Sequence, residues 1–337
     1  MLRADDFADL AMNRIANVEN VVCSVDTMSR HPELFHYTKP EAFEGIVKSQ
    51  TFWASHYREM LDKNEVRLMR TLLPVAVAPR FEGIVAPLSR HDRRLFKAAG
   101  GGLGVAKDFV NSLYGATLDG KASYAAIDVY MASFSTHSHD SDFEREHGLS
   151  SQWKEYAGPA GFCLVFDIAE MARMLGKEMD SRYWVRLTLD PVRYADAPIE
   201  DLFPELVHAS TDTLRNFLSG VRYPEMAVPE FLAGATLLKG ADYRPEREVR
   251  IVAIPGTGRL SKQAAKEYPT DFKNLPLPEV RTQLGATKRY IPIFDNLGLK
   301  LPIKRVIVGP GDRQDERAAI ARLLVGDVPV FCSRCST

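Results

Sequence analysis

The sequence predicts a single α+β domain with a helical insertion, and three observations support this prediction. A short strand, a helix and a second short strand follow one another between residues 34 and 55. Strand-like runs dominate after residue 124, whereas the stretch from about 60 to 125 has the pattern of helix and loop. A chain of 337 residues can bury roughly three quarters of its surface in one large domain.

The opening segment is the most informative part of the chain. His36 and Thr38 are two residues apart in an apolar run, so both leave the expected strand on one face. Pro40 suits the start of the following helix, where Phe43 and Ile46 have helical spacing. Each unpaired buried polar group costs roughly 1–3 kcal/mol. The pair therefore indicates either a ligand site or a hydrogen-bonded core histidine beside an edge threonine.

The later elements follow from apolar runs and from helical spacing. We expect strands over residues 127–134, 161–166, 183–189, 246–253, 289–294 and 304–308, and helices over 62–74, 153–156, 168–174, 198–219 and 312–324. The glycine run at 100–104 lacks the spacing of a phosphate-binding loop, so we interpret it as a hinge between two helices. The expected organisation is a helical extension over 1–30, the main domain over 31–325 with its insertion at about 60–125, and a tail over 326–337.

Composition excludes several classes of protein. Net charge is −1, with 45% apolar and 26% charged residues, so no global field attracts nucleic acid or an anionic membrane. A local basic groove stays open, but composition does not argue for one. No apolar run reaches the roughly 18 residues of a membrane span, and acids at Asp5, Asp6 and Asp9 do not suit a secretory signal. We expect a cytoplasmic protein with no membrane partner. Cys332 and Cys335 have zinc-like spacing but no second pair, so a frayed tail is favoured and no metal is expected.

Polar residues recur at strand ends with period-two spacing. Ser133 and Ser135 form one such set, and Glu246, Glu248 and Arg250 form another. Two carboxylates on one face would repel each other, which raises the pKa of one of them unless a ligand or cation separates them. The alternative is ion pairing with a neighbouring arginine. We expect Arg250 to orient a carboxylate or to contact a ligand phosphate, because its guanidinium suits both.

Two further groups have alternative interpretations. Trp153 and Tyr156 are three residues apart on an expected helix face, where they would either stack on a planar ligand or pack in the core. The loop from His137 to Asp142, with His147, contains imidazoles and carboxylates that suit a metal. Its spacing misses the binuclear His-x-His-x-Asp-His pattern, so a solvated loop is favoured.

Together these segments resemble an uncharacterised bacterial family known as domain of unknown function 2971. The resemblance covers roughly residues 33–325. It rests on Phe35–Thr38, Ser55 with Met60–Glu65, Ala132–Ser135, Trp153 with Tyr156 and Ala157, Gly161–Phe166, Glu246–Arg250 and Val306–Pro310. One departure is Leu61, where the family usually has Asn.

The order of these motifs is also similar to that of ADP-ribosyltransferases of the His–Tyr–Glu type. This resemblance implies a central split β-sheet and NAD as substrate, with the side chains of His36 and Glu248 in one cleft. It implies that Glu248 stabilises the oxocarbenium-like centre formed when the glycosidic bond breaks, and that Glu246 activates an acceptor. The candidate catalytic residues are Glu248, Glu246 and His36, and the candidate NAD-binding residues are His36, Tyr37, Thr38, Ser133, Ser135, Trp153, Tyr156 and Arg250. The serine pair also looks like the Ser-Thr-Ser strand of a sister branch.

The function expected from this resemblance is an NAD-consuming ADP-ribosyltransferase or NAD glycohydrolase, such as a toxin, an effector or a phage-defence protein. Its acceptor would be a protein or a nucleic acid. Two alternatives stay open. One is a metal-dependent nuclease or other phosphoryl-transfer enzyme that uses the His137–Asp142 loop. The other is a sensor that binds a nucleotide without turnover.

Overall fold

The structure, a computed structural model, describes residues 22–60, 66–119, 127–138, 140–220, 227–256, 273–283 and 286–335. Their contacts group into two compact units. The first, called here the helical unit, comprises the described parts of 60–129 and 193–242. The second, the sheet unit, comprises 22–59, 130–192 and the described parts of 243–337. The α+β class predicted from the sequence is confirmed.

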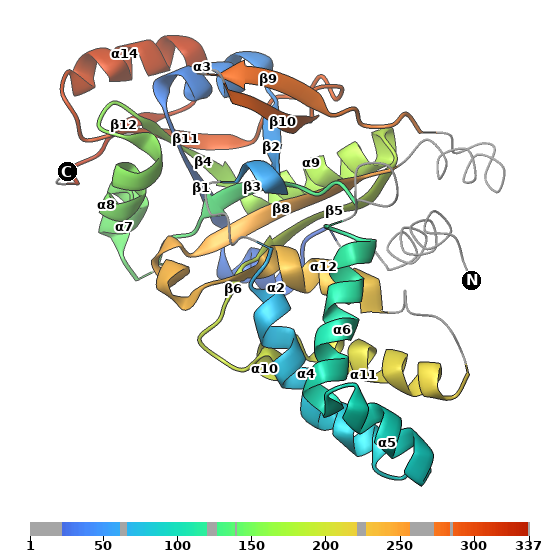
Figure 1. Cartoon of the computed structure of the whole chain (residues 1–337). Helices are drawn as coiled ribbons and strands as arrows, with labels where there is room; N and C mark the ends of the chain where they lie inside the picture. The colour runs from blue at the N-terminus through green and yellow to red at the C-terminus, as the bar shows by residue number, and fades with distance from the viewer. Residues whose placement is uncertain are drawn as a thin grey trace. The chain divides into compact units, whose positions relative to one another are not determined.

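The sheet unit contains most of the strands. Its strands are β1 (Glu33–Thr38), β2 (Phe52–His56), β3 (Tyr130–Ser135), β4 (Phe162–Asp167), β5 (Trp184–Pro191), β8 (Glu248–Pro255), β9 (Glu279–Gln283), β10 (Ala286–Ile293), β11 (Ile303–Val308) and β12 (Val330–Cys332). Its helices are α2 (Val25–Arg30), α3 (Pro40–Ser49), α7 (Asp142–His147), α8 (Ser150–Gln152), α9 (Ile168–Ser181) and α14 (Gln314–Val325), with the short turns η1 (Tyr57–Glu59) and η2 (Trp153–Ala157). Figure 1 shows these elements along the chain.

All ten of these strands form one sheet, and it is split at β3. The main order is β12-β11-β4-β1-β3-β2-β10-β9, and β8 joins β3 to β5 beside this path. One edge of β3 pairs with β8 along the whole strand. On the other edge, Ser135 pairs with β1, whereas Tyr130 and Met131 pair with β2. Among the described strands, the residues between them, 132–134, have no partner on that edge. The two halves of the sheet therefore separate beside Ser133.

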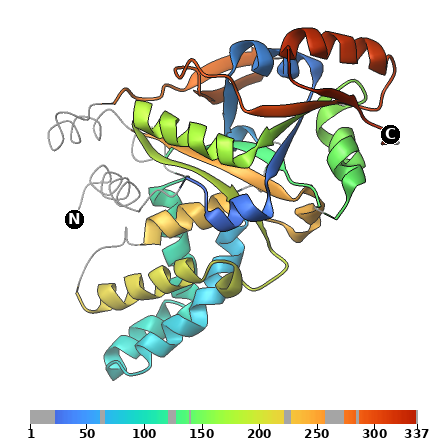
Figure 2. The ribbon, with the colours of Figure 1, turned by 180° about the vertical axis from the view of Figure 1, so that it is seen from behind.

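The two faces of this sheet have different surroundings. The larger hydrophobic cluster combines Leu34, Phe134 and Ile251 with apolar side chains of α3, α9 and α14. Figure 2 shows α9 lying along this face. The opposite face has a smaller cluster around Phe35, Tyr37 and Trp153, and its part over β3 and β8 is polar. Residues that alternate along one strand thus enter either the large apolar core or a second buried layer, which holds Glu248 and Arg250.

The helical unit is built around a pair of long helices. Its elements are α4 (Met69–Val85), α5 (Arg90–Ala98), α6 (Gly101–Ala116), β6 (Arg193–Tyr194), α10 (Ile199–Leu202), α11 (Pro204–Leu218), α12 (Val228–Leu237) and β7 (Leu238–Lys239), and the turn η4 (Ala241–Glu246) follows β7. The insertion expected from the sequence forms α4 to α6, and residues 193–242 join it. Gly100 has a φ of 90° between α5 and α6, so the glycine run begins at a turn between two helices, as expected, but its other glycines lie in the first turn of α6.

Several expectations require correction or lie outside the described residues. The tail is not frayed, because β12 pairs with β11 in parallel and Cys335 is buried. Glu246 belongs to η4 rather than to a strand, since Arg247 adopts a φ of 47° and turns the chain before β8 begins. The helix expected before residue 22 lies outside the described part, which does contain α2. No described helix has the length and apolar character needed to cross a bilayer.

Candidate functional site

Ser133 lies where the sheet splits and faces two charged residues of β8. It pairs with Arg250, and Ser135 pairs with Glu248. Side chains of directly opposed residues lie on the same face of a sheet, so the four side chains share the polar face. The Ser133 hydroxyl oxygen is buried and has no hydrogen-bond partner in the described part of the chain. It is therefore a group that a bound ligand could satisfy.

Glu248 and Arg250 form a buried ion pair on this face. Arg250 is fully buried and Glu248 is 6% exposed. The guanidinium donates from Nε to Oε1 at 2.6 Å and from Nη2 to Oε2 at 3.1 Å, which is a bidentate arrangement. A charge-assisted pair of this kind is stronger than a neutral hydrogen bond and fixes the orientation of both groups. Arg250 thus orients a carboxylate, which is also the ion pairing with a neighbouring arginine expected as the alternative, and its contact with a ligand stays a prediction.

Tyr156 connects the π-helical turn η2 to the start of β8. Its hydroxyl donates to Glu246 Oε1 at 2.8 Å, and Ser135 Oγ donates to the Glu246 carbonyl at 2.7 Å. Burial and the nearby Glu246 carboxylate raise the pKa of Tyr156, so its phenol stays protonated. The structure thus brings Tyr156, Glu246 and Glu248 together, although Glu246 arrives from a turn.

His36 lies on the opposite face of the sheet, so the expectation that it shares a cleft with Glu248 is wrong. The cause is the register: Phe35 pairs with Ser135, and Ser135 pairs with Glu248. The imidazole of His36 instead contacts Phe52 and Phe134 of the larger core. Its Nδ1 lies 3.1 Å from the Ser133 carbonyl, which can only accept, so Nδ1 carries the proton. Burial lowers the pKa of His36 and keeps the ring neutral. This bond lies where β3 has no strand partner.

Two aromatic candidates are packed inside the smaller cluster. Trp153 is 2% exposed, contacts Tyr37 edge to face at 4.9 Å, and donates from Nε1 to the His147 carbonyl. It therefore cannot stack on a ligand as the helix spacing allowed. The Tyr37 hydroxyl accepts from the Leu149 amide and bonds His137 Nε2 at 2.9 Å. These internal bonds remove Trp153 and Tyr37 from the candidate NAD-binding residues.

One more candidate, Thr38, lies away from Glu248, and one segment of the family resemblance is mostly outside the described residues. Thr38 is buried on the face of His36, as their spacing predicted, and is thereby separated from Glu248. The segment Met60–Glu65, which supports the family resemblance, lies mostly outside the described residues.

The histidine loop is used for packing. His137 stacks on Phe35 with ring centroids 3.5 Å apart, and its Nδ1 donates to the Glu144 carbonyl at 2.7 Å. Burial lowers the pKa of His137 to about 4. The ring is thus neutral, and its Nε2 accepts from Tyr37. His139 lies outside the described residues, and among those described no group of three His, Cys, Asp or Glu side chains could hold a metal.

Sequence reasoning missed two residues of β5 on the polar face. Asp190 pairs with Arg250, and Thr188 pairs with Val252. The Thr188 hydroxyl is buried without a hydrogen-bond partner in the described part of the chain. A signal was present, because Arg186, Thr188 and Asp190 alternate with apolar residues. It was missed because the strand was interpreted only from its apolar positions.

Comparisons of the chain with family models, with curated proteins and with solved structures find no match. An oriented carboxylate, a hydroxyl without a partner and a tyrosine–carboxylate pair meet where the sheet splits. Such a group can hold a polar ligand and stabilise positive charge that develops on it.

Proposed function

We propose that the protein is an NAD-consuming ADP-ribosyltransferase or NAD glycohydrolase that acts at the polar face of β3 and β8. One observation supports this most: the Glu248 carboxylate is held by the buried Arg250, and Ser133, the strand partner of Arg250, has a buried hydroxyl without a hydrogen-bond partner among the described residues. Breaking the bond between nicotinamide and ribose leaves positive charge on the sugar carbon. A preoriented carboxylate stabilises that charge without reorganising during the reaction.

Each residue of this face has a role in the proposal. Arg250 fixes the orientation of the Glu248 carboxylate through two hydrogen bonds. Ser133 offers a hydrogen bond to a ribose hydroxyl or to the nicotinamide amide. Glu246, held by Tyr156, removes a proton from an acceptor when transfer occurs. Hydrolysis depends less on this base, since the attacking water does not need a binding site for an acceptor.

Because His36 lies on the opposite face, the site is less similar to the His–Tyr–Glu transferases than the sequence implied. The site no longer has the histidine of the His–Tyr–Glu type. It retains a strand with two serines facing a carboxylate on the next strand, which is the arrangement that Ser133, Ser135 and Glu248 have here. The proposal therefore rests on likeness to the Ser-Thr-Ser branch.

The decisive experiment measures nicotinamide release from NAD by the full-length protein. We expect release by the wild type and little by Glu248→Gln, which keeps the shape of the side chain but removes its charge. Glu248→Asp is a second variant, because it keeps a counter-charge for Arg250 while withdrawing the carboxylate by one methylene. Loss of release in both, with the fold retained in the Asp variant, would support a catalytic carboxylate. No release by the wild type under any condition would contradict the proposal.

A second candidate function is nucleotide binding without turnover. The observation that favours it is the bidentate pair itself, because both Glu248 oxygens already accept from Arg250. Tight NAD binding in calorimetry without nicotinamide release would identify this function. A metal-dependent nuclease is not proposed, since His137 already bonds Tyr37 and Glu144 and stacks on Phe35.

A further inference from the structure

Helix α5 of the helical unit is exposed along most of its length, and Phe96 alone among its residues is half-buried. It runs from Arg90 to Ala98 and buries no residue. Ser89 caps its first turn, accepting from the Asp92 amide at 3.1 Å. Leu95 is 58% exposed. A helix without buried residues contributes little to the core, so core packing does not explain its composition.

Four cations form a stripe on this helix. Arg90, Arg93, Arg94 and Lys97 have the spacing i, i+3, i+4 and i+7, which places them on one side of a helix. In the described part of the chain, no ion pair involves Arg90, Arg94 or Lys97, and Arg93 donates to the Ala86 carbonyl. We call these four residues the α5 stripe.

Among the described residues, no neighbouring acid forms an ion pair with the α5 stripe. Asp92 accepts from the Ser89 hydroxyl, Glu82 accepts from the Gly102 amide, and Asp119 pairs with Arg70. Residues 66–119 contain eight Lys and Arg against four Asp and Glu, whereas the whole chain has a net charge of −1. Positive charge is therefore concentrated in this part of the helical unit.

This arrangement disfavours the isolated helix. Like charges at i,i+3 and i,i+4 repel each other, and Arg90 occupies the first turn, where the helix dipole already places positive charge. Polyanion binding would remove both penalties. An exposed cationic stripe that costs helix stability is thus explained by a partner that supplies negative charge.

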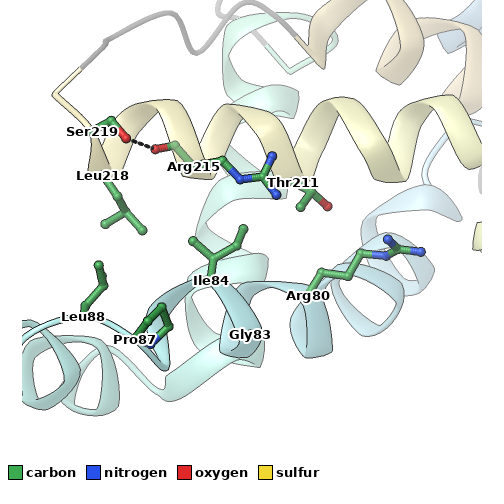
Figure 3. A pocket seen from close by; sticks show the side chains of 9 residues that line it. All are labelled: Arg80, Gly83, Ile84, Pro87, Leu88, Thr211, Arg215, Leu218 and Ser219. Carbon is green, nitrogen blue, oxygen red and sulfur yellow. Dashed lines mark hydrogen bonds between the residues drawn. The ribbon is translucent and has the colours of Figure 1, made fainter.

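A pocket beside the start of α5 adds one more cation, Arg80, because its other arginine, Arg215, pairs with Asp212. It has a volume of about 550 Å³. Figure 3 shows Arg80 of α4 and Arg215 of α11 lining it, together with Pro87 and Leu88 of the turn that leads into α5. In the described residues, Arg80 has no hydrogen bond or ion pair, so its guanidinium can meet an anion.

We propose that the helical unit binds the phosphate backbone of a nucleic acid through the α5 stripe. Guanidinium groups bind phosphate in a bidentate manner, and three of the four cations are arginines. An anionic membrane fits less well, because α5 offers Leu95 and Phe96 as its only large apolar side chains and interfacial helices need a broad apolar face. The inference does not depend on the function proposed for the sheet unit.

The test is fluorescence anisotropy of the full-length protein with a labelled 20-base-pair DNA duplex and a labelled 20-nucleotide RNA, over a range of salt concentrations. The variant Arg90→Gln/Arg94→Gln/Lys97→Gln removes three cations and keeps good helix formers. The matched control, Lys48→Gln/Arg173→Gln/Arg313→Gln, removes three exposed cations of the sheet unit that pair with Glu44, Glu170 and Glu316.

For the wild type we expect affinity that falls steeply with salt. The α5 variant should lose about tenfold or more in affinity, and the slope of log K against log salt on duplex DNA should fall by about 2 to 3, since each phosphate contact contributes about 0.9. The control variant should keep most of the affinity and most of the salt slope. Equal losses in the two variants would overturn the proposal, because net charge alone would then explain binding. Wild-type binding to vesicles containing phosphatidylserine but not to either nucleic acid would also overturn it.

Discussion

Two buried carboxylates of the sheet unit, Glu178 and Glu248, have opposite surroundings. Glu178 on α9 accepts from the Trp184 indole at 3.3 Å and from the Phe294 amide at 3.0 Å, and Arg182 lies 3.6 Å away. These bonds connect a helix to the end of β10. Burial raises the pKa of Glu178. Glu248 instead gives both oxygens to one guanidinium.

The difference separates a structural carboxylate from a candidate catalytic one. The neighbours of Glu178 are donors that its oxygens already satisfy. The neighbours of Glu248 include a second carboxylate, Glu246, and the Ser133 hydroxyl, which has no described partner. Burial alone therefore does not identify function. What distinguishes Glu248 is that polar groups around it still have capacity to bind a ligand.

The strongest test of this contrast compares Glu248→Gln with Glu178→Gln. We expect Glu248→Gln to lower NAD turnover by roughly 10²–10³, equivalent to about 3–4 kcal/mol of transition-state stabilisation. Glu178→Gln should lower the free energy of unfolding by about 1–3 kcal/mol, because its amide N–H group would face another donor. Turnover per folded molecule should stay unchanged in that variant. Nicotinamide release and urea unfolding measure the two effects.

Stability must also be measured for Glu248→Gln, since Arg250 is fully buried. Removing one partner of a buried ion pair is destabilising because the other charge is left uncompensated. Activity that falls only in proportion to the unfolded fraction would make Glu248 structural, like Glu178, and would erase the contrast.

Glu33 provides a third carboxylate with an arginine partner. It accepts from both Arg305 nitrogens, at 2.6 and 2.8 Å, and from Lys304 at 2.9 Å. Burial alone would raise its pKa, but the bonds from Arg305 and Lys304 outweigh burial and lower the pKa to about 2 from 4.5. A folded-state pKa below the unfolded value gives stability that is present above pH 4.5 and is lost as the pH falls toward 2.

We expect the stability that is lost between pH 4.5 and 2 to amount to at most about 3 kcal/mol. The variant Glu33→Gln should lack this contribution at every pH. The free energy of unfolding of the variant should then fall less steeply than that of the wild type between pH 4.5 and 2. Urea unfolding across this range measures the slope. Parallel slopes would show that the pKa of Glu33 is the same in the folded and unfolded states, and that its bonds to Arg305 and Lys304 add no stability that depends on pH.

Arg250→Lys tests whether bidentate geometry matters at the buried pair. Lysine keeps the charge but cannot reproduce the fork of two parallel bonds. We expect about 2 kcal/mol less stability, the size of one hydrogen bond to a charged group, together with weaker NAD turnover. Arg305→Lys is the matched control, because it changes the same geometry at a more exposed site, and it should cost less than about 1 kcal/mol. Equal losses of stability in Arg250→Lys and Arg305→Lys would show that the bidentate geometry matters no more at the buried pair than at the more exposed one.

Much of the fold could be predicted from local patterns. The run at 161–166 is apolar throughout and forms β4, and the helices expected at 168–174 and 312–324 correspond to α9 and α14. Such patterns are local: a strand buried on both faces is a continuous apolar run, and a helix buried on one side has apolar residues at helical spacing. The assignment of 193–242 to the helical unit could not be predicted, because it depends on packing between distant segments.

The site was predicted in part, and its errors share one cause. Spacing showed that His36 and Thr38 share a face, and that Glu248 and Arg250 share a face. It could not show which faces coincide, because a shift of one residue in register exchanges the two faces of a strand. Glu246 was placed on the strand because nothing in the local pattern revealed the positive φ of Arg247.

The smallest expected effect concerns the Tyr156–Glu246 pair, which marks the Glu248 site as different from that of Glu178. We expect Tyr156→Phe and Glu246→Gln to show a coupling of about 1 kcal/mol in a double-mutant cycle of stability.

Glu246→Gln should reduce transfer to an acceptor more than hydrolysis, because only the acceptor must lose a proton to a base. The ratio of modified acceptor to free ADP-ribose measures this. Tyr290→Phe is the control, since Tyr290 donates to the exposed Glu279 in the same way, and it should leave the ratio unchanged. A ratio that Glu246→Gln also leaves unchanged would restrict Glu246 to holding Tyr156 and would leave Glu248 as the single acting carboxylate of the site.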